Sequence, residues 1–108
     1  MNKERRKALS KIVKMLQQMM PDAESPKPSQ EATDEARLAI ENIVNEEQEA
    51  FDNLPESLQE SARGELAQEG IDGVQEAVDA LDGITEDDNA EEVYQALQDA
   101  IEHIENVI

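Results

Sequence analysis

Residues 46–65 of this 108-residue chain read EEQEAFDNLPESLQESARGE, and this stretch decides how the chain is organised. It contains seven acidic residues, the only phenylalanine of the protein and a proline near its middle. Pro55 suits the first turn of a helix and disfavours helical dihedral angles at Leu54, so one helix is expected to end here and another to begin. Either Asn53 or Leu54 would cap the second helix. Phe51 is expected to anchor the end of the first helix in the core, with the acids around it pointing outward.

Apolar residues recur at helical spacing on both sides of this turn. Residues 30–53 are expected to form one helix, with Ser29 as its N-cap, and residues 55–82 are expected to form the next. The buried positions expected in the first are Ala32, Ala36, Ala39, Ile40, Ile43, Ala50, Phe51 and Leu54. Those expected in the second are Leu58, Ala62, Leu66, Gly70, Val74, Ala77, Val78 and Leu81.

Three glycines, Gly64, Gly70 and Gly73, fall inside the helix expected over residues 55–82. Each is roughly 1 kcal/mol less favourable than alanine in a helix interior. They indicate either a break near Gly64 or a close approach by a neighbouring helix, and of the two we expect close packing.

A basic amphipathic helix is expected at the start of the chain, over residues 3–20, ending at Pro21. Its apolar face carries Leu9, Ile12, Val13, Leu16, Met19 and Met20. Residues 21–29 follow as a linker, because they contain closely spaced prolines and no apolar periodicity. The first helix could therefore pack on its own chain, on another copy or on a different partner.

The last expected helix covers residues 89–107. A capping-box pattern introduces it, made either by Thr85 with Asp88 or by Asn89 with Glu92. Its apolar stripe is Val93, Leu97, Ala100, Ile101, Ile104 and Ile108.

The fold class expected from this pattern is all-α. Residues 1–20 form a basic amphipathic helix, residues 21–29 a Pro-containing linker, and residues 30–108 an acidic bundle of three helices. Short turns between these three favour antiparallel neighbours. The composition agrees, because a chain with no Cys or Trp, one Tyr and one Phe must build its core from aliphatic residues, Met and Ala, which favours helices.

The net charge of −18 is unevenly distributed. Residues 1–20 hold six basic residues and one acid, giving +5, whereas residues 21–108 hold three basic residues and 26 acids, giving −23. Such a body repels nucleic acid and anionic membranes and attracts basic proteins. We therefore expect a basic partner protein, itself a candidate nucleic-acid-binding protein, and no direct contact with nucleic acid or membrane.

Ten carboxylates form the expected partner-binding surface. Five of them, from Glu65 to Asp79, are spaced by three or four residues along the helix expected over residues 55–82, so they share one face of it. Together with a second acidic helix they could approach the charge density of a DNA duplex, which makes nucleic-acid mimicry a hypothesis; an ordinary solvated face is the other. The ten are Glu46, Glu49, Asp52, Glu56, Glu60, Glu65, Glu69, Asp72, Glu76 and Asp79.

The basic face of the first helix is expected to clasp the acidic body, either within one chain or between copies. Its apolar face has no Trp or Phe that would favour a membrane surface. A homo-oligomer is therefore the alternative assembly. The residues of the clasp are Arg5, Arg6, Lys7, Lys11 and Lys14.

No residue set indicates catalysis, a metal site or a cofactor. His103 is the only histidine, and the sequence around it offers no Ser or Cys nucleophile and no cluster of metal ligands. The acids after Asp82 or Asp87 do not fit the register of a calcium-binding loop. The Glu-x-x-His motif of di-metal bundles is absent because Ala100 takes the Glu position. We therefore expect a non-enzymatic protein.

Residues 46–65, after a basic MNKERRK start and before acidic helical sequence, resemble a family of small, uncharacterised, acidic helical proteins of tailed bacteriophages and mobile elements. The shared core is EEQEAFDNLPESLQ-S-RGE, and the resemblance covers most of the chain except the linker DAESPKPSQ and the turn GITEDDNAEE. It implies a phage or mobile-element origin, a helical fold and the cytoplasm of a bacterial host, but no mechanism.

Two functional hypotheses follow from this resemblance and from the charge. The first is an acidic protein-interaction module, a nucleic-acid mimic that inhibits a host or defence protein that binds nucleic acid. The alternative is a self-associating structural or assembly accessory protein, in which basic first helices clasp acidic bodies.

Overall fold

A computed structural model describes residues 2–21 and 26–108, and the regular structure in these ranges is entirely helical. The prediction of an all-α fold is confirmed. Residues 22–25 of the expected linker lie outside the described part of the chain. The helices in order are α1 (Lys3–Met19), α2 (Gln30–Asp52), α3 (Glu56–Gln59), α4 (Ala62–Asp82) and α5 (Ala90–Glu105).

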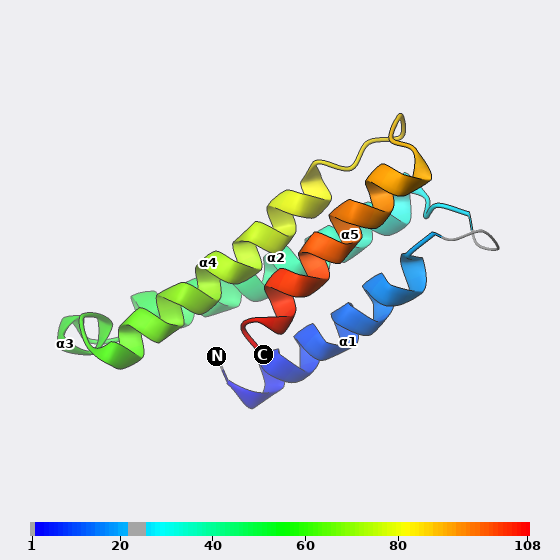
Figure 1. The fold of residues 1–108 in the computed structure, drawn as a ribbon. Coiled ribbons are helices and arrows are strands. Elements are labelled where there is room, and N and C mark those ends of the chain that lie inside the picture. The colour runs from blue at the N-terminus through cyan, green and yellow to red at the C-terminus, as the bar shows by residue number, and fades with distance from the viewer. Residues whose placement is uncertain (1, 22–25) are drawn as a thin grey trace.

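The four long helices lie side by side as a bundle, and successive ones run in alternating directions (Figure 1). α1 and α4 each pack against both α2 and α5. The helices α2 and α4 have 23 and 21 residues, against 17 and 16 in α1 and α5. At one end of the bundle, α2 and α4 therefore project past the other two helices, with α3 at their tip (Figure 1). The molecule is elongated as a result, with principal extents of 51 × 22 × 18 Å.

The core between these helices is built from aliphatic side chains, largely those that the spacing predicted. Phe51 packs against its edge and is partly buried. Ile108 is 43% exposed, so its assignment to the last stripe was wrong, because it follows the end of α5. α1 contributes Leu9, Ile12, Val13 and Leu16. α5 contributes Val93, Leu97, Ala100, Ile101 and Ile104.

Each of the four long helices begins at a side-chain cap, and two of these caps, those of α2 and α5, were predicted from the sequence. The hydroxyl of Ser29 accepts a hydrogen bond at 3.1 Å from the backbone N–H three residues on, which confirms it as the N-cap of α2. Asn89 caps α5 in the same way at 2.8 Å. Thr85 and Asp88 instead close the preceding turn, where the Thr85 N–H donates to the Asp88 carboxylate at 2.9 Å.

The start of α3 differs from the prediction. Pro55 itself occupies the N-cap position, with φ −56° and ψ 147°, and Asn53 is the C-cap of α2. Because the pyrrolidine ring already fixes the backbone of Pro55 near this φ, neither Asn53 nor Leu54 is needed as a cap.

The helix expected over residues 55–82 is two helices, with a break at Glu60 and Ser61. Ser61 has an extended backbone, with φ −76° and ψ 169°, and its hydroxyl accepts a hydrogen bond from the Gly64 N–H at 3.3 Å. A serine in this conformation caps a new helix, so α3 cannot continue into α4.

The three glycines of α4 have different surroundings. A Cβ atom at Gly64 would lie 2.1 Å from the carbonyl oxygen of Gln59, and one at Gly73 would lie 2.7 Å from a Val107 methyl. At Gly70 no atom would lie within 4 Å. Close packing is therefore found at Gly64 and Gly73, between α4 and the α3 turn and between α4 and the end of α5.

The buried face of α4 also differs from the prediction at its first half. Ile71 is buried, whereas Ala62 is exposed and the side chains of Leu58 and Leu66 are 42% and 68% exposed. The reason is the length of the covering helix. The chain after α5 meets α4 at Gly73, and no helix of the described ranges covers that side of α4 before Gly73. The positions predicted correctly are Val74, Ala77, Val78 and Leu81.

We expect Gly64→Ala to destabilise the protein and Gly70→Ala to stabilise it. Each substitution gains about 1 kcal/mol of helix propensity. At Gly64 the new methyl group meets backbone atoms of α3, and overpacking of this kind costs typically about 1–3 kcal/mol. Urea denaturation followed by circular dichroism gives both free energies of unfolding. An equal gain in the two variants would contradict the close packing at Gly64.

Candidate functional site: a groove at the end of the bundle

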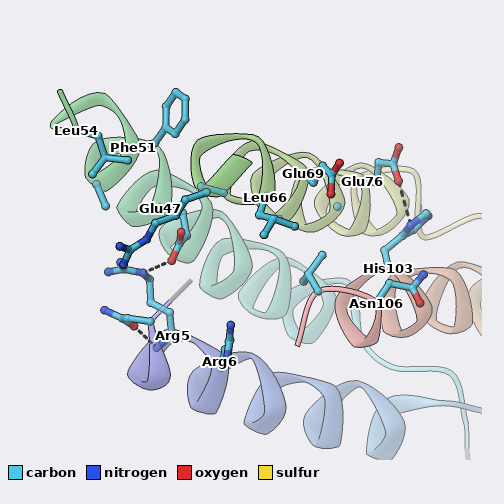
Figure 2. A pocket seen from close by; sticks show the side chains of 17 residues that line it. Arg5, Arg6, Glu47, Phe51, Leu54, Leu66, Glu69, Glu76, His103 and Asn106 are labelled. Carbon is cyan, nitrogen blue, oxygen red and sulfur yellow. Dashed lines mark hydrogen bonds and ion pairs between the residues drawn. The ribbon is translucent and has the colours of Figure 1, made fainter. Parts of the chain in front are cut away.

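A groove of about 800 Å³ lies where α1 begins, α5 ends and the pair α2–α4 continues (Figure 2). The helices α2 and α4 supply its apolar part, and the ends of α1 and α5 supply its two walls. The apolar lining consists of Ala50, Phe51, Leu54, Leu66, Ala67 and Gly70. The walls consist of Asn2, Arg5, Arg6, His103, Asn106 and Val107.

An ion pair between Arg5 and Glu47 holds the α1 wall against α2 (Figure 2). The Glu47 side chain is only 6% exposed and that of Arg5 21%, so the carboxylate is buried and depends on this guanidinium. Asn2 caps α1 and accepts a hydrogen bond from the Arg5 N–H at 2.8 Å. Glu47 was not predicted to be buried, although its spacing from Ile43 and Val44 places it on the apolar stripe of α2.

The apolar part of the groove is open to solvent. Leu66 is 68% exposed, more than any other large apolar side chain in the described ranges. By helical spacing Leu66 and Gly70 lie on the side of α4 that also carries Gly73. The end of the chain after α5 reaches this side only at Gly73, through Val107, so the preceding two turns of α4 are uncovered.

The charged groups of the groove are separated. Glu69 and Glu76 of α4 lie toward the α5 wall, and the His103 Nδ1 atom is 3.0 Å from a Glu76 carboxylate oxygen (Figure 2). The α1 wall and the start of α4 are basic, so three of the four arginines of an otherwise acidic chain line this one groove. These are Arg5, Arg6 and Arg63.

All ten carboxylates predicted to bind a partner are exposed. They lie on α2, on α3 and its C-cap, and on α4. Within the described ranges Glu76 is the only one within ion-pair distance of a basic side chain, the His103 imidazole. Asp52, Asp72 and Asp79 accept hydrogen bonds of 3.0, 3.0 and 3.1 Å from glutamines four residues earlier. The surface therefore keeps nearly all of its negative charge.

The basic helix α1 packs against α2 and α5 of its own chain. The contact is mainly apolar, because four aliphatic side chains of α1 are buried in the core. Of the five basic residues predicted to form the clasp, Arg5 pairs with Glu47. The others form no ion pair with a carboxylate in the described part of the chain, and all four are exposed. They are Arg6, Lys7, Lys11 and Lys14.

In residues 2–21 and 26–108, no helix combines the length and the apolar character that a membrane crossing needs. Across the same residues, no three acidic or histidine side chains gather as ligands for a metal ion would. No protein-family model, curated protein or solved structure matches the chain.

Proposed function

We propose that this protein is a non-enzymatic interaction module whose acidic surface binds a basic protein, one that itself binds nucleic acid. The observation that carries the proposal is the exposure of all ten carboxylates of that surface. Because only Glu76 lies within ion-pair distance of a basic side chain in the described ranges, the other nine are available to a partner. Clustered, uncompensated charge of this kind attracts and orients a partner of opposite charge.

The spacing of these carboxylates supports mimicry of a nucleic acid. The five on α4, between residues 65 and 79, span about 21 Å of helix, or one carboxylate every ~5 Å. α2 packs beside α4, with helix axes typically about 8–10 Å apart, and its carboxylates Glu46, Glu49 and Asp52 add a second row. A DNA duplex carries one charge per ~1.7 Å of its axis, so the two rows are sparser than DNA but are fixed on rigid helices.

A phage or mobile-element origin, which the resemblance of residues 46–65 implies, fits a protein that inhibits a host or defence protein. A protein that binds nucleic acid holds Lys and Arg side chains in positions that suit phosphates. Those side chains would pair with the carboxylates of this protein, which the helices hold at fixed positions. The protein would then compete with nucleic acid for that surface.

The alternative function, a self-associating accessory joined by its first helices, has less support. Leu9 and Leu16 of α1 are fully buried in the core of their own chain, together with Ile12 and Val13. Releasing α1 to clasp a second copy would expose all four side chains to water, which opposes such an exchange.

The test is capture of partners from a bacterial extract on the immobilised protein, followed by displacement with duplex DNA or heparin. Neutralising five carboxylates around the α2–α3 turn is expected to weaken capture about tenfold or more, because several charge pairs are lost together. The test variant carries Glu46→Gln, Glu49→Gln, Asp52→Asn, Glu56→Gln and Glu60→Gln.

The matched control removes the same charge from exposed acids elsewhere and should bind as the unmodified protein does. If both variants lose the partner equally, net charge alone governs binding, and if neither does, the proposed surface is wrong. The control variant carries Glu31→Gln, Glu35→Gln, Asp99→Asn, Glu102→Gln and Glu105→Gln, all at exposed positions.

A further inference from the structure

We propose that two copies of this protein associate through the groove. In this dimer the hairpin end, residues 48–72, of one copy lies antiparallel on the hairpin end of the other, related by a two-fold axis. The inference goes beyond the proposed function and does not rest on it. Because the dimer would occupy Asp52, Glu56 and Glu60 of the acidic surface, the dimer and a basic partner would compete for these carboxylates.

The hairpin end is a two-helix layer with one uncovered side. Along the rest of the bundle, α1 and α5 pack against α2 and α4. α1 reaches along α2 only to Glu47, which Arg5 binds, and the end of α5 reaches along α4 only to Gly73, beside Val107. The two helices of a second hairpin end would take the places of the two missing helices and complete a four-helix cross-section.

The two hairpin ends have the same length because they belong to identical copies, so one can lie along the other. α4 runs for about 16 Å between Ala62 and Gly73, and the same length is available on the second copy. An antiparallel overlap under two-fold symmetry places each tip against the wall of the other groove, and every contact forms twice. The centre of the overlap falls near residue 67 of α4, so the two Leu66 side chains lie close to the axis.

The overlap also buries the apolar groups that the monomer leaves in water. Leu66 is 68% exposed, and the surface beside it at Gly70 is open. Ala50 is exposed, and Phe51 and Leu54 are only partly buried. Exposed apolar groups gathered in a hollow are typical of interaction sites rather than of solvated faces.

Charge favours a second copy as the occupant. The tip of each hairpin end carries Asp52, Glu56 and Glu60, which pair with no cation in the described ranges. In the overlap this acidic tip meets the α1 wall of the other copy, where Arg6 is exposed and forms no ion pair with a carboxylate in the described ranges.

The complementary contact forms on the other side of the groove. The second copy's Arg63 approaches the wall that carries Glu69 and Glu76 of the first. Both signs of charge in the groove are thus matched by one occupant, whereas a uniformly acidic or basic peptide would match one wall only.

The net charge of −18 opposes association, because the two copies repel each other at long range. Added salt screens this repulsion more than it weakens contacts at close range. The dimer should therefore be favoured at about 0.5 M NaCl, whereas binding of a basic partner to the acidic surface should weaken there. The salt dependence distinguishes failure of this inference from failure of the proposed function.

The first experiment measures mass by sedimentation equilibrium in about 0.5 M NaCl. We expect the mass of the intact protein to rise with concentration from 12.0 kDa toward twice that value. Leu66→Glu should raise the dissociation constant at least about tenfold. The matched control is Leu38→Glu, at a leucine of α2 that is 50% exposed and outside the groove. A monomer at every concentration, or equal effects of the two variants, would overturn the proposal.

The second experiment uses the absence of cysteine from the chain. Leu66→Cys introduces a single thiol near the proposed axis, and mild oxidation should link two copies covalently. Leu38→Cys should give little linked product under the same conditions. Because both positions are exposed, neither change should prevent folding, which circular dichroism verifies. Equal linking of the two variants would place the contact elsewhere.

Discussion

Leu16→Ala is expected to lower the free energy of unfolding by about 3 kcal/mol, because truncating a buried leucine removes apolar contacts and leaves a cavity. Leu16 is fully buried where α1 meets the core. Neutralising Lys7, Lys11 and Lys14 together with glutamine should change stability by about 1 kcal/mol or less, since exposed substitutions have small effects. Urea denaturation followed by circular dichroism measures both changes.

The control for this comparison is Leu38→Ala. Leu38 is half exposed, so the same chemical change there should cost about 1 kcal/mol or less. If the lysine variant were destabilised as much as Leu16→Ala, charge attraction rather than apolar packing would hold α1 to the bundle. A separate, early unfolding step for α1 would also contradict the single core.

Arg5→Met is expected to lower the free energy of unfolding by about 2 kcal/mol, because it leaves the buried Glu47 carboxylate without its partner. The value is below that of a fully buried pair because the Arg5 side chain is 21% exposed. Glu47→Leu should change stability little, since a leucine fits an apolar position and the freed Arg5 can reach water. The double variant should recover the stability that Arg5→Met loses.

The four proteins form a double-mutant cycle, measured by urea denaturation, and its interaction energy isolates the pair. Arg37→Met serves as the control, because the carboxylates that Arg37 pairs with, Glu41 at 2.9 Å and Asp82 at 3.7 Å, are much more exposed than Glu47, and each pair should contribute about 0.5 kcal/mol or less. Additive effects of Arg5→Met and Glu47→Leu would mean that the carboxylate does not depend on Arg5.

The sequence allowed the long helices and most of their buried faces to be predicted. In α1 and α5 the apolar residues recur at three- and four-residue spacing, and such residues must share one face of a helix. Nine of those twelve predicted positions are buried, Met19 and Met20 are partly buried, and Ile108 is exposed. Spacing does not show how far a covering helix extends, and this is why Leu66 was expected in the core. It lies on the correct side of α4 but beyond the end of α5.

The groove could not be predicted because its residues come from opposite ends of the chain. Arg5 and Val107 are separated by nearly the whole sequence, and only the packing of α1 and α5 on α2 and α4 brings them to one site. Glu47 was missed for a different reason. It stands in an acidic run whose other members are solvated, although its spacing from Val44 already indicated the buried face.

The position of the chain ends affects how this protein can be labelled. Asn2 and Val107, which are close to the two ends of the chain, both line the groove at one end of the bundle. A fusion partner, affinity tag or dye joined at either end would therefore start at the mouth of the groove and could block it sterically. The turn between α4 and α5 lies at the opposite end of the bundle, and Asp87 within it is exposed. Attachment at Asp87 keeps both the groove and the ten carboxylates accessible.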